Sequence, residues 1–353
     1  MSVDRADEAA RSVLTLFGGP LLGLPGTHLA ATARPGPAPR LWHYWWQAHL
    51  LDCLVDARRR GSRVVDAGLL RRHLRGIRLR NWGRLRNRYF DDMAWLALAA
   101  QRAGRPAGGL DARLRSAITG DWGGGAFWST DRTFKNTAAT APIALHLART
   151  GRLDEAASLL DWLDDHLADP ETGLYRDGLR LAGGSARERV ALMVGRPTRI
   201  ATGSSADLVP HVFTYNQGPV LAVMLRLGRL DQAARHVDAV AEHLTHPATM
   251  VLRTHGDGDG GLFTGILTRY LALAARDVRL PGSTRATAID LTTAFAEALW
   301  DGRDTRGWRH QPVTIFPQDT TATGTAPPGH TVELAGQLQA WMALEAAAAA
   351  RPD

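Results

Sequence analysis

Residues 87–95 read Asn-Arg-Tyr-Phe-Asp-Asp-Met-Ala-Trp and run directly into the apolar stretch Leu-Ala-Leu-Ala-Ala at 96–100. Two adjacent carboxylates, Asp91 and Asp92, therefore stand where an aromatic pair ends and a helix begins. In the first helical turn they lie near the positive end of the helix dipole, which favours negative charge. The helix that follows is too apolar for the surface, so it carries both charges toward the middle of the protein. A helix cap explains most Asp-Asp pairs, but inward-directed charge indicates a functional site.

A second pair, Asp164–Asp165, shows the ordinary pattern for comparison. The apolar residues around it keep helical spacing, which predicts that both acids face solvent. Nothing there indicates chemistry. What distinguishes the first pair is its aromatic surroundings, formed by Tyr89, Phe90 and Trp95.

Hydrophobic periodicity predicts about twelve helices and little strand. The odd-numbered helices are amphipathic, whereas the even-numbered ones are more apolar, and most of these begin with aromatic and amide-rich clusters. If the apolar helices form an inner ring and the amphipathic ones an outer ring, the clusters converge on one cleft. We therefore predict an all-α fold, an (α/α)6 barrel or toroid, as a single domain over 1–353. The predicted helices span 4–17, 42–60, 64–79, 91–103, 108–119, 134–149, 153–168, 216–227, 231–245, 262–276, 284–301 and 331–349.

A break in the helical pattern falls between the seventh and eighth helices. Two strand-like stretches, 173–178 and 209–215, bracket a glycine-rich segment at about 181–208, and we expect a short β-hairpin-like insertion. The segment between them is expected to form either a lid over the cleft or a disordered surface loop. Residues 317–330 are expected to form a long connection, and the alanines at 346–350 a fraying tail.

Composition limits the possible classes of protein. With 45% hydrophobic residues, 353 residues can bury a large core. The only cysteine, Cys53, excludes an internal disulfide and a cysteine-based zinc site, and we expect it in the core. The acidic N-terminus has no signal-peptide pattern, and no stretch is long enough for a membrane span. We expect a cytoplasmic monomer.

The basic balance reflects arginine usage rather than a nucleic-acid surface. The net charge of +7 comes from a chain in which all but one of 42 basic residues are arginine. The run formed by Arg71, Arg72, Arg75 and Arg78 shares its helix with apolar residues on the opposite side, which predicts a solvated outer face and no nucleic-acid partner. The single lysine, Lys135, instead falls within a polar cluster at a predicted helix start.

Two apparent ligand motifs are rejected. Residues 256–261 match G-x-G-x-x-G, but no strand-turn-helix unit of a parallel sheet surrounds them. The same acids imitate the start of a calcium loop, yet Gly261 and Thr268 occupy the fifth and twelfth ligand positions. The histidines lack metal-ligand spacing. We therefore expect no metal and no cofactor.

Five sequence blocks, in order, resemble glycoside hydrolase family 76, and the resemblance is strongest over 42–272. The family contains endo-α-1,6-mannanases with an (α/α)6 fold and a catalytic Asp-Asp pair. The resemblance implies that Asp91 is the nucleophile and Asp92 the general acid/base. Two departures, Thr140-Ala141 where an Asn-Gly pair is expected and Thr264 where a lysine is expected, concern subsite preference. The blocks lie at 45–50, 89–95, 134–137, 215–218 and 260–266.

The spacing of the two aspartates bears on the stereochemistry. Adjacent α-carbons lie about 3.8 Å apart, which allows carboxyl groups near 5 Å, the separation typical of retaining glycosidases, and makes the wider inverting separation difficult. We therefore predict a retaining glycoside hydrolase that works by a two-aspartate double displacement. The helix N-terminus lowers the pKa of both carboxyl groups. If Asp92 is to act as an acid, its pKa must be raised by the charge of Asp91 and by desolvation.

The expected substrate is an α-mannan or manno-oligosaccharide, cleaved at α-1,6-mannosidic linkages. A mannosyl transglycosylase on the same scaffold and a non-catalytic α-mannan-binding toroid remain alternatives. An epimerase or lyase would need a histidine or tyrosine base, and only His49 and His211 lie near the clusters.

Eleven further residues are candidates for substrate binding. The aromatic ones would stack on sugar rings, and the polar ones would bind hydroxyl groups. Their alternative roles are core packing for the aromatic rings and capping or bridging of inner helices for the amides and Asp259. The candidates are Trp45, Trp46, Gln47, Tyr89, Trp128, Lys135, Asn136, Tyr215, Asn216, Gln217 and Asp259.

Overall fold

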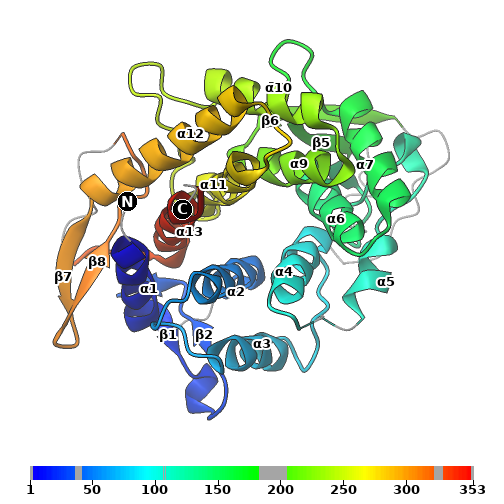
Figure 1. Cartoon of the computed structure of the whole chain (residues 1–353). Helices are drawn as coiled ribbons and strands as arrows, with labels where there is room; N and C mark the ends of the chain where they lie inside the picture. Colours follow the sequence, from blue (N-terminus) through cyan, green and yellow to red (C-terminus); the bar gives the residue numbers. More distant parts are fainter. Residues whose placement is uncertain are drawn as a thin grey trace.

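The computed structural model describes residues 3–35, 42–105, 107, 109–182, 205–321 and 329–350. In this part of the chain six helices form a closed inner ring, because each packs against the next and the last packs against the first (Figure 1). In ring order they are α2 (Tyr44–Arg59), α4 (Phe90–Arg102), α6 (Thr137–Arg149), α9 (Thr214–Leu227), α11 (Gly260–Arg276) and α13 (Leu334–Ala350).

The outer helices pack against the ring from outside (Figure 1). They alternate with the inner helices along the chain, which confirms the predicted (α/α)6 toroid. Burial explains the two sequence patterns: α9 and α13 are buried on nearly every side, whereas α10 buries one helical face. The outer helices are α1 (Val3–Phe17), α3 (Leu69–Arg80), α5 (Leu110–Arg115), α7 (Leu153–His166), α10 (Leu230–His243) and α12 (Gly282–Asp301).

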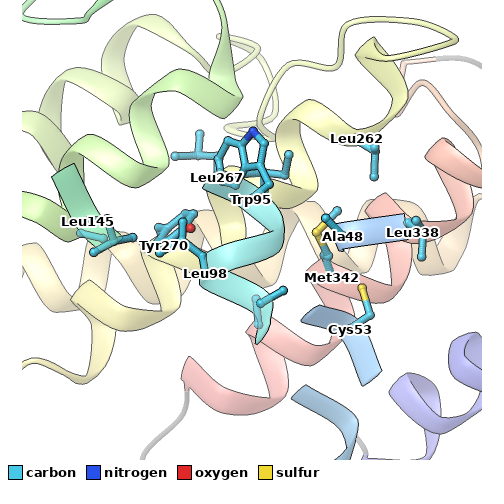
Figure 2. Close-up of a cluster of buried hydrophobic side chains, with 14 of the residues drawn as sticks. Ala48, Cys53, Trp95, Leu98, Leu145, Leu262, Leu267, Tyr270, Leu338 and Met342 are labelled. Atoms are coloured by element: carbon cyan, nitrogen blue, oxygen red, sulfur yellow. The ribbon is translucent and has the colours of Figure 1, made fainter. Parts of the chain in front are cut away.

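The middle of the ring is filled by side chains. Leu98, Leu145, Leu267 and Met342 come from four different inner helices and are almost completely buried (Figure 2). Cys53 of α2 joins them with 0% exposure, as predicted for the single cysteine. The toroid is therefore a packed core, whose two ends are closed to one another by apolar side chains.

Three short strands form an antiparallel sheet beside the inner ring: β4 (Phe134–Asn136), β5 (Arg176–Leu181) and β6 (Ala206–Val212). The expected hairpin-like insertion is confirmed, with both strands displaced by about three residues from the predicted ranges. Gly178 permits the close pairing with β4, because a Cβ atom there would lie 2.4 Å from the carbonyl oxygen of Lys135. Residues 183–204, on which the lid expectation depends, lie outside the described residues.

Several small elements were not predicted. The strands β7 (Asp304–Trp308) and β8 (Gln311–Ile315) form a hairpin through Arg309 and His310, whose φ values are 46° and 67°. Two-residue strands also pair, β1 with β2 and β3 with β9. The remaining elements are β1 (Gly18–Gly19), β2 (Leu29–Ala30), β3 (Ala33–Arg34), β9 (Val332–Glu333) and the 3-10 helices η1 (Leu21–Gly23) and η2 (Asp121–Gly123).

Three local predictions are corrected. The helix predicted over 134–149 begins only at Thr137, because its first residues pair as β4. The predicted fraying tail is wrong, because α13 continues to a fully buried Ala350. Asp164 does not simply face solvent: its carboxylate accepts hydrogen bonds from the Tyr175 hydroxyl and the Gln232 amide. Only its neighbour Asp165 is exposed.

The basic face of α3 agrees with the sequence pattern, since Arg71, Arg75 and Arg78 are exposed and Leu70 and Ile77 are buried. Within the described ranges, no helix combines the length and the apolar character needed to cross a bilayer. In the same ranges, no group of three or more His, Cys, Asp or Glu side chains is arranged to hold a metal ion.

Candidate active site

The amino-terminal ends of the inner helices open onto a cavity of about 670 Å³, the cleft. Side chains from the starts of α2, α4, α9 and α11 line it, together with the residue that caps α6, so the predicted convergence of the motif clusters is observed. Eight of the predicted site residues lie in its wall: Trp45, Tyr89, Asp91, Asp92, Trp128, Asn136, Tyr215 and Asp259.

Asp91 and Asp92 occupy the first turn of α4, at the wall of the cleft. The Asp91 Oδ2 atom accepts a 2.9 Å hydrogen bond from the indole nitrogen of Trp128. Its Oδ1 atom is buried and has no hydrogen-bond partner in the described part of the chain. Asp92 accepts a short hydrogen bond from the side-chain amide of Asn87. The two carboxylates therefore differ in how their charged forms are supported.

Burial raises the pKa of the Asp91 carboxyl to about 7, although backbone N–H groups of the first helical turn and the Trp128 indole oppose the shift. Burial is also the main cause that raises the pKa of Asp92 well above its usual range, and the neighbouring charge of Asp91 adds to it. The predicted lowering by the helix N-terminus exists but is outweighed by desolvation. Because fewer hydrogen-bond donors stabilise its charged form, Asp92 stays protonated more readily than Asp91 does.

Aromatic rings line the cleft together with the two carboxylates. Tyr89 and Trp128 pack with ring centroids 4.9 Å apart. Across the cleft, Tyr215 and Phe263 stack at 4.0 Å with an interplanar angle of 23°, and Trp45 lies 6.3 Å from Tyr215. Such faces suit the apolar faces of sugar rings.

Asp259 joins two inner helices at the rim of the cleft. Its Oδ1 atom accepts hydrogen bonds from the indole nitrogens of Trp45, at 3.0 Å, and Trp46, at 2.8 Å. Trp46 does not line the cleft: it is 3% exposed and stacks on His43. Adjacent residues at this helix start thus have different roles, Trp45 at the cleft and Trp46 in the core.

The glutamines of the motif clusters bind backbone rather than the cleft. Gln47 accepts from the N–H and donates to the C=O of Ala30, both at 3.0 Å. Gln217 makes the same pair of bonds with Tyr175, both at 2.9 Å. The prediction that these two amides contact substrate is corrected, and their alternative role of bridging is the one observed.

This arrangement, which we call the backbone clamp, recurs at the fourth residue of four inner helices. Gln337 of α13 clamps the N–H and C=O of Phe316 at 2.9 Å. In α6 the hydroxyl of Thr140 replaces the amide and bonds to the N–H and C=O of Ala126. The departure from the family pattern at Thr140 is therefore a structural contact.

The prediction that Lys135 contacts substrate is also corrected, because its side chain lies in the core and not in the cleft. It is fully buried, and its ammonium group donates to the carbonyl oxygens of Thr119, Asp121 and Gly124, which lie around η2. Its neighbour Asn136 does line the cleft, and its side chain also caps α6 by accepting from Ala139 N.

Asn216 is 1% exposed and lies outside the cleft wall. Thr264, the other departure from the family pattern, is fully buried and donates to the carbonyl oxygen of Arg253. Neither His49 nor His211 lines the cleft, so the histidines weighed for an epimerase or lyase do not reach it.

Sequence reasoning missed several residues of the cleft wall. Asp177 on β5 adds a carboxylate whose pKa is raised by burial. Its only sequence signal was its place in a predicted strand. Asn87 and Trp95 lay within the first motif but were not assigned to the site. The other unassigned wall residues are Trp42, His43, Tyr44, Asn81, Arg88, Phe134, Arg180 and Phe263.

An (α/α)6 toroid with paired carboxylates in a cleft lined by aromatic rings has the architecture of a carbohydrate-active protein. No family model matches the chain, and no curated protein sequence matches it. Among solved structures, the GH76A α-1,6-mannanase of Salegentibacter sp. HEL1_6 has 26% sequence identity and a TM-score of 0.80, over 99% of each chain.

An inactive variant of that mannanase, in which two consecutive aspartates are replaced by asparagine, was solved with α-1,6-mannotriose and has a TM-score of 0.79. This variant has 26% identity over 99% of each chain. A family 76 mannosidase of Bacteroides thetaiotaomicron has 18% identity and a TM-score of 0.72, over 98% of this chain and 97% of the other. These similarities confirm the resemblance to glycoside hydrolase family 76 and the toroidal fold.

Proposed function

We propose that this protein is a retaining glycoside hydrolase that cleaves α-1,6-mannosidic linkages of an α-mannan. The observation that carries the proposal is the Asp91–Asp92 pair at the head of α4, in the wall of a cleft flanked by aromatic rings. The similar Salegentibacter enzyme, an α-1,6-mannanase made inactive by replacing two consecutive aspartates, supports the same reading.

In this mechanism Asp92 donates its proton to the glycosidic oxygen while Asp91 attacks the anomeric carbon, which forms a mannosyl-Asp91 ester and frees the leaving sugar. A nucleophilic role of Asp91 is supported by the Trp128 indole and the backbone N–H groups of the first helical turn, which stabilise the charged form of its carboxylate. Esterification removes the charge of Asp91. The pKa of Asp92 then falls, so that it can deprotonate the water that hydrolyses the ester.

Substrate recognition follows from the wall of the cleft. Tyr89 with Trp128, and Tyr215 with Phe263, offer stacking faces in the same cleft as the carboxylates. Asp177 is a hydrogen-bonding group for sugar hydroxyls. Because two separate aromatic pairs line the cleft, we expect an oligomer to bind better than a single sugar.

The test is release of reducing ends from linear α-1,6-mannan by the wild type, Asp91→Asn and Asp92→Asn, with the anomer of the first product read by NMR. We expect an α-product from the wild type and loss of release in both variants. Asp165→Asn is the matched control, because it changes an exposed aspartate on α7. A folded wild type that releases nothing contradicts the hydrolase proposal.

The same samples separate the alternatives. Longer products formed only when a manno-oligosaccharide acceptor is added identify mannosyl transfer. Mannan binding that is unchanged in Asp92→Asn, without turnover by the wild type, identifies a binding protein. An inverted β-product would contradict the retaining mechanism while leaving the substrate assignment intact.

A further inference from the structure

A second cavity, also of about 670 Å³, lies where the inner helices end. We call it the basic cavity. The inner helices run parallel and contain 13 to 17 residues, so this cavity lies roughly 20–25 Å from the cleft, at the opposite end of the toroid. Five helices each place an arginine of their last turn in its wall: Arg59, Arg102, Arg149, Arg226 and Arg276.

The wall of the basic cavity carries an excess of positive charge. Seven arginines line it, against the three carboxylates Asp52, Asp56 and Glu345. Guanidinium groups stay charged in proteins, so the excess is not removed by deprotonation. Such an excess around a cavity favours an anion.

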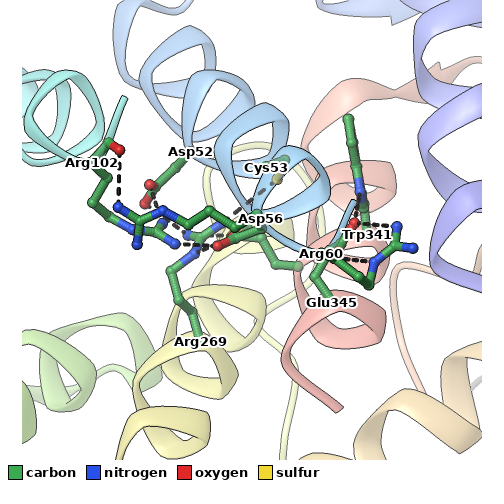
Figure 3. A network of polar contacts seen from close by, with 10 residues as sticks. Asp52, Cys53, Asp56, Arg60, Arg102, Arg269, Trp341 and Glu345 are labelled. Atoms are coloured by element: carbon green, nitrogen blue, oxygen red, sulfur yellow. Dashed lines mark hydrogen bonds and ion pairs between the residues drawn. The ribbon is translucent and has the colours of Figure 1, made fainter. Parts of the chain in front are cut away.

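The three carboxylates are already neutralised by three of the arginines (Figure 3). Arg102 pairs with Asp52 and with Asp56, and Arg269 pairs with the same two acids at 3.4 and 3.0 Å. Arg60 pairs with Glu345 at 2.7 Å. In the described residues the other four have no carboxylate partner, namely Arg59, Arg149, Arg226 and Arg276.

Arg149 is the least satisfied of these four. Its Nη1 atom is buried and has no hydrogen-bond partner among the described residues. Burial, and then the nearby charges of Arg102 and Arg226, lower the pKa of its guanidinium. A buried donor without an acceptor costs free energy, and a bound anion would remove that cost.

Arginines at the carboxyl ends of helices also have a purely structural role, since each offsets the helix dipole by about 0.3–1 kcal/mol. That role accounts for Arg59, Arg226 and Arg276, which are exposed. It does not account for a cavity of this volume, nor for the unpartnered Nη1 atom of Arg149.

We propose that the basic cavity binds a small phosphorylated compound carrying at least two negative charges. A guanidinium fork matches phosphate oxygens in bidentate geometry, and four such groups without carboxylate partners call for more than one charge. The volume lies within the range of small-molecule sites. Ala272, Leu273 and Met342 in the wall give an organic moiety an apolar surface. This site is independent of the cleft and of the proposed glycosidase activity.

Isothermal titration with inorganic pyrophosphate tests the proposal on the full chain, at an ionic strength held constant with sodium chloride. The test variant is Arg226→Gln/Arg276→Gln, because both side chains are exposed and their replacement leaves the core intact. The control is Arg71→Gln/Arg75→Gln, which removes two exposed charges from α3 instead. Circular dichroism establishes that each variant is folded.

We expect the wild type and the α3 control to bind one pyrophosphate per chain with equal affinity, and the test variant to bind at least tenfold more weakly. Arg149→Gln should weaken binding further. The proposal is overturned if the wild type does not bind millimolar pyrophosphate, since the cavity is then no site for such an anion. It is also overturned if both double variants lose affinity equally or if sulfate binds as tightly, since either result reduces the cavity to a general electrostatic surface.

Discussion

The indole N–H of Trp128 donates a 2.9 Å hydrogen bond to Asp91 Oδ2 in the wall of the cleft. The backbone reinforces this contact, because Phe90 N donates to Trp128 O at 2.7 Å and Tyr89 pairs with Ser129. The segment that carries Trp128 is thereby fixed to the first turn of α4. One oxygen of Asp91 is held in place by a group that itself cannot move far.

The first prediction concerns Trp128→Phe, which keeps the ring contact with Tyr89 but removes the donor to Asp91. A hydrogen bond to a charged group contributes about 1.5 kcal/mol, so its loss should raise the pKa of Asp91 by about one unit. The acidic limb of the pH profile of kcat/KM on α-1,6-mannan should move to higher pH by that amount. In the control, Trp45→Phe removes an indole donor to Asp259, and the limb should stay in place.

The second prediction is that Asp92→Asn stabilises the fold. The folded-state pKa of Asp92 is raised, so the stability associated with its neutral form is full below the unfolded pKa and is lost as pH rises. Asparagine removes that loss and can still accept from Asn87. We expect a gain of about 1 kcal/mol at pH 8, after allowance for partial exposure to the cleft, that shrinks toward zero near pH 4. Asp165→Asn should change the thermal midpoint little at either pH, and equal gains in both variants would exclude this explanation.

The third prediction separates structure from binding at Lys135. Lys135→Met leaves three partly buried carbonyl acceptors around η2 without their donor. We expect a loss of about 3 kcal/mol in the free energy of unfolding, measured by urea denaturation, because unpaired buried acceptors are costly. The KM for mannan of the folded fraction should change less than twofold. An unchanged free energy of unfolding with a raised KM would instead support a role of Lys135 in substrate binding.

The fourth prediction tests the backbone clamp. Gln47→Leu leaves both the N–H and the C=O of Ala30 unpaired in a buried position, which should cost about 2–4 kcal/mol in stability. Gln101→Leu is the control on an inner helix, because the Gln101 Oε1 atom has no hydrogen-bond partner in the described residues. The two variants should differ by several degrees in thermal midpoint, and a similar small effect of both would show that the clamp contributes little.

Much of the fold could be predicted because the burial of each helix determines the spacing of apolar residues in its sequence. Inner helices such as α13 are apolar on all sides, and outer helices such as α10 on one, so the alternation of the two patterns indicates two rings. The β7–β8 hairpin has no comparable sequence pattern. Its turn residues, Arg309 and His310, adopt positive φ values that are usually signalled by Asn or Gly.

The candidate site was predicted less completely, because a motif gives position along a helix but not the direction of each side chain. Trp45 and Trp46 are adjacent, yet a rotation of about 100° per residue turns the first to the cleft and the second to the core. The convergence of the helix starts predicts substrate contacts for Gln47 and Gln217, but their partners are backbone groups. Asp177 reaches the cleft only through the pairing of β5, which no local pattern specifies.

The clamps at Ala30, Tyr175 and Phe316 have a consequence for how this architecture can vary. Each clamp holds one residue of a connecting segment against the first turn of an inner helix. Chain added or removed between clamped residues alters loop-closure entropy only slowly with length. Insertions and deletions on this side of the toroid should therefore be tolerated without displacing Asp91 and Asp92, so new surroundings for the same two carboxylates can arise by exchange of loops alone.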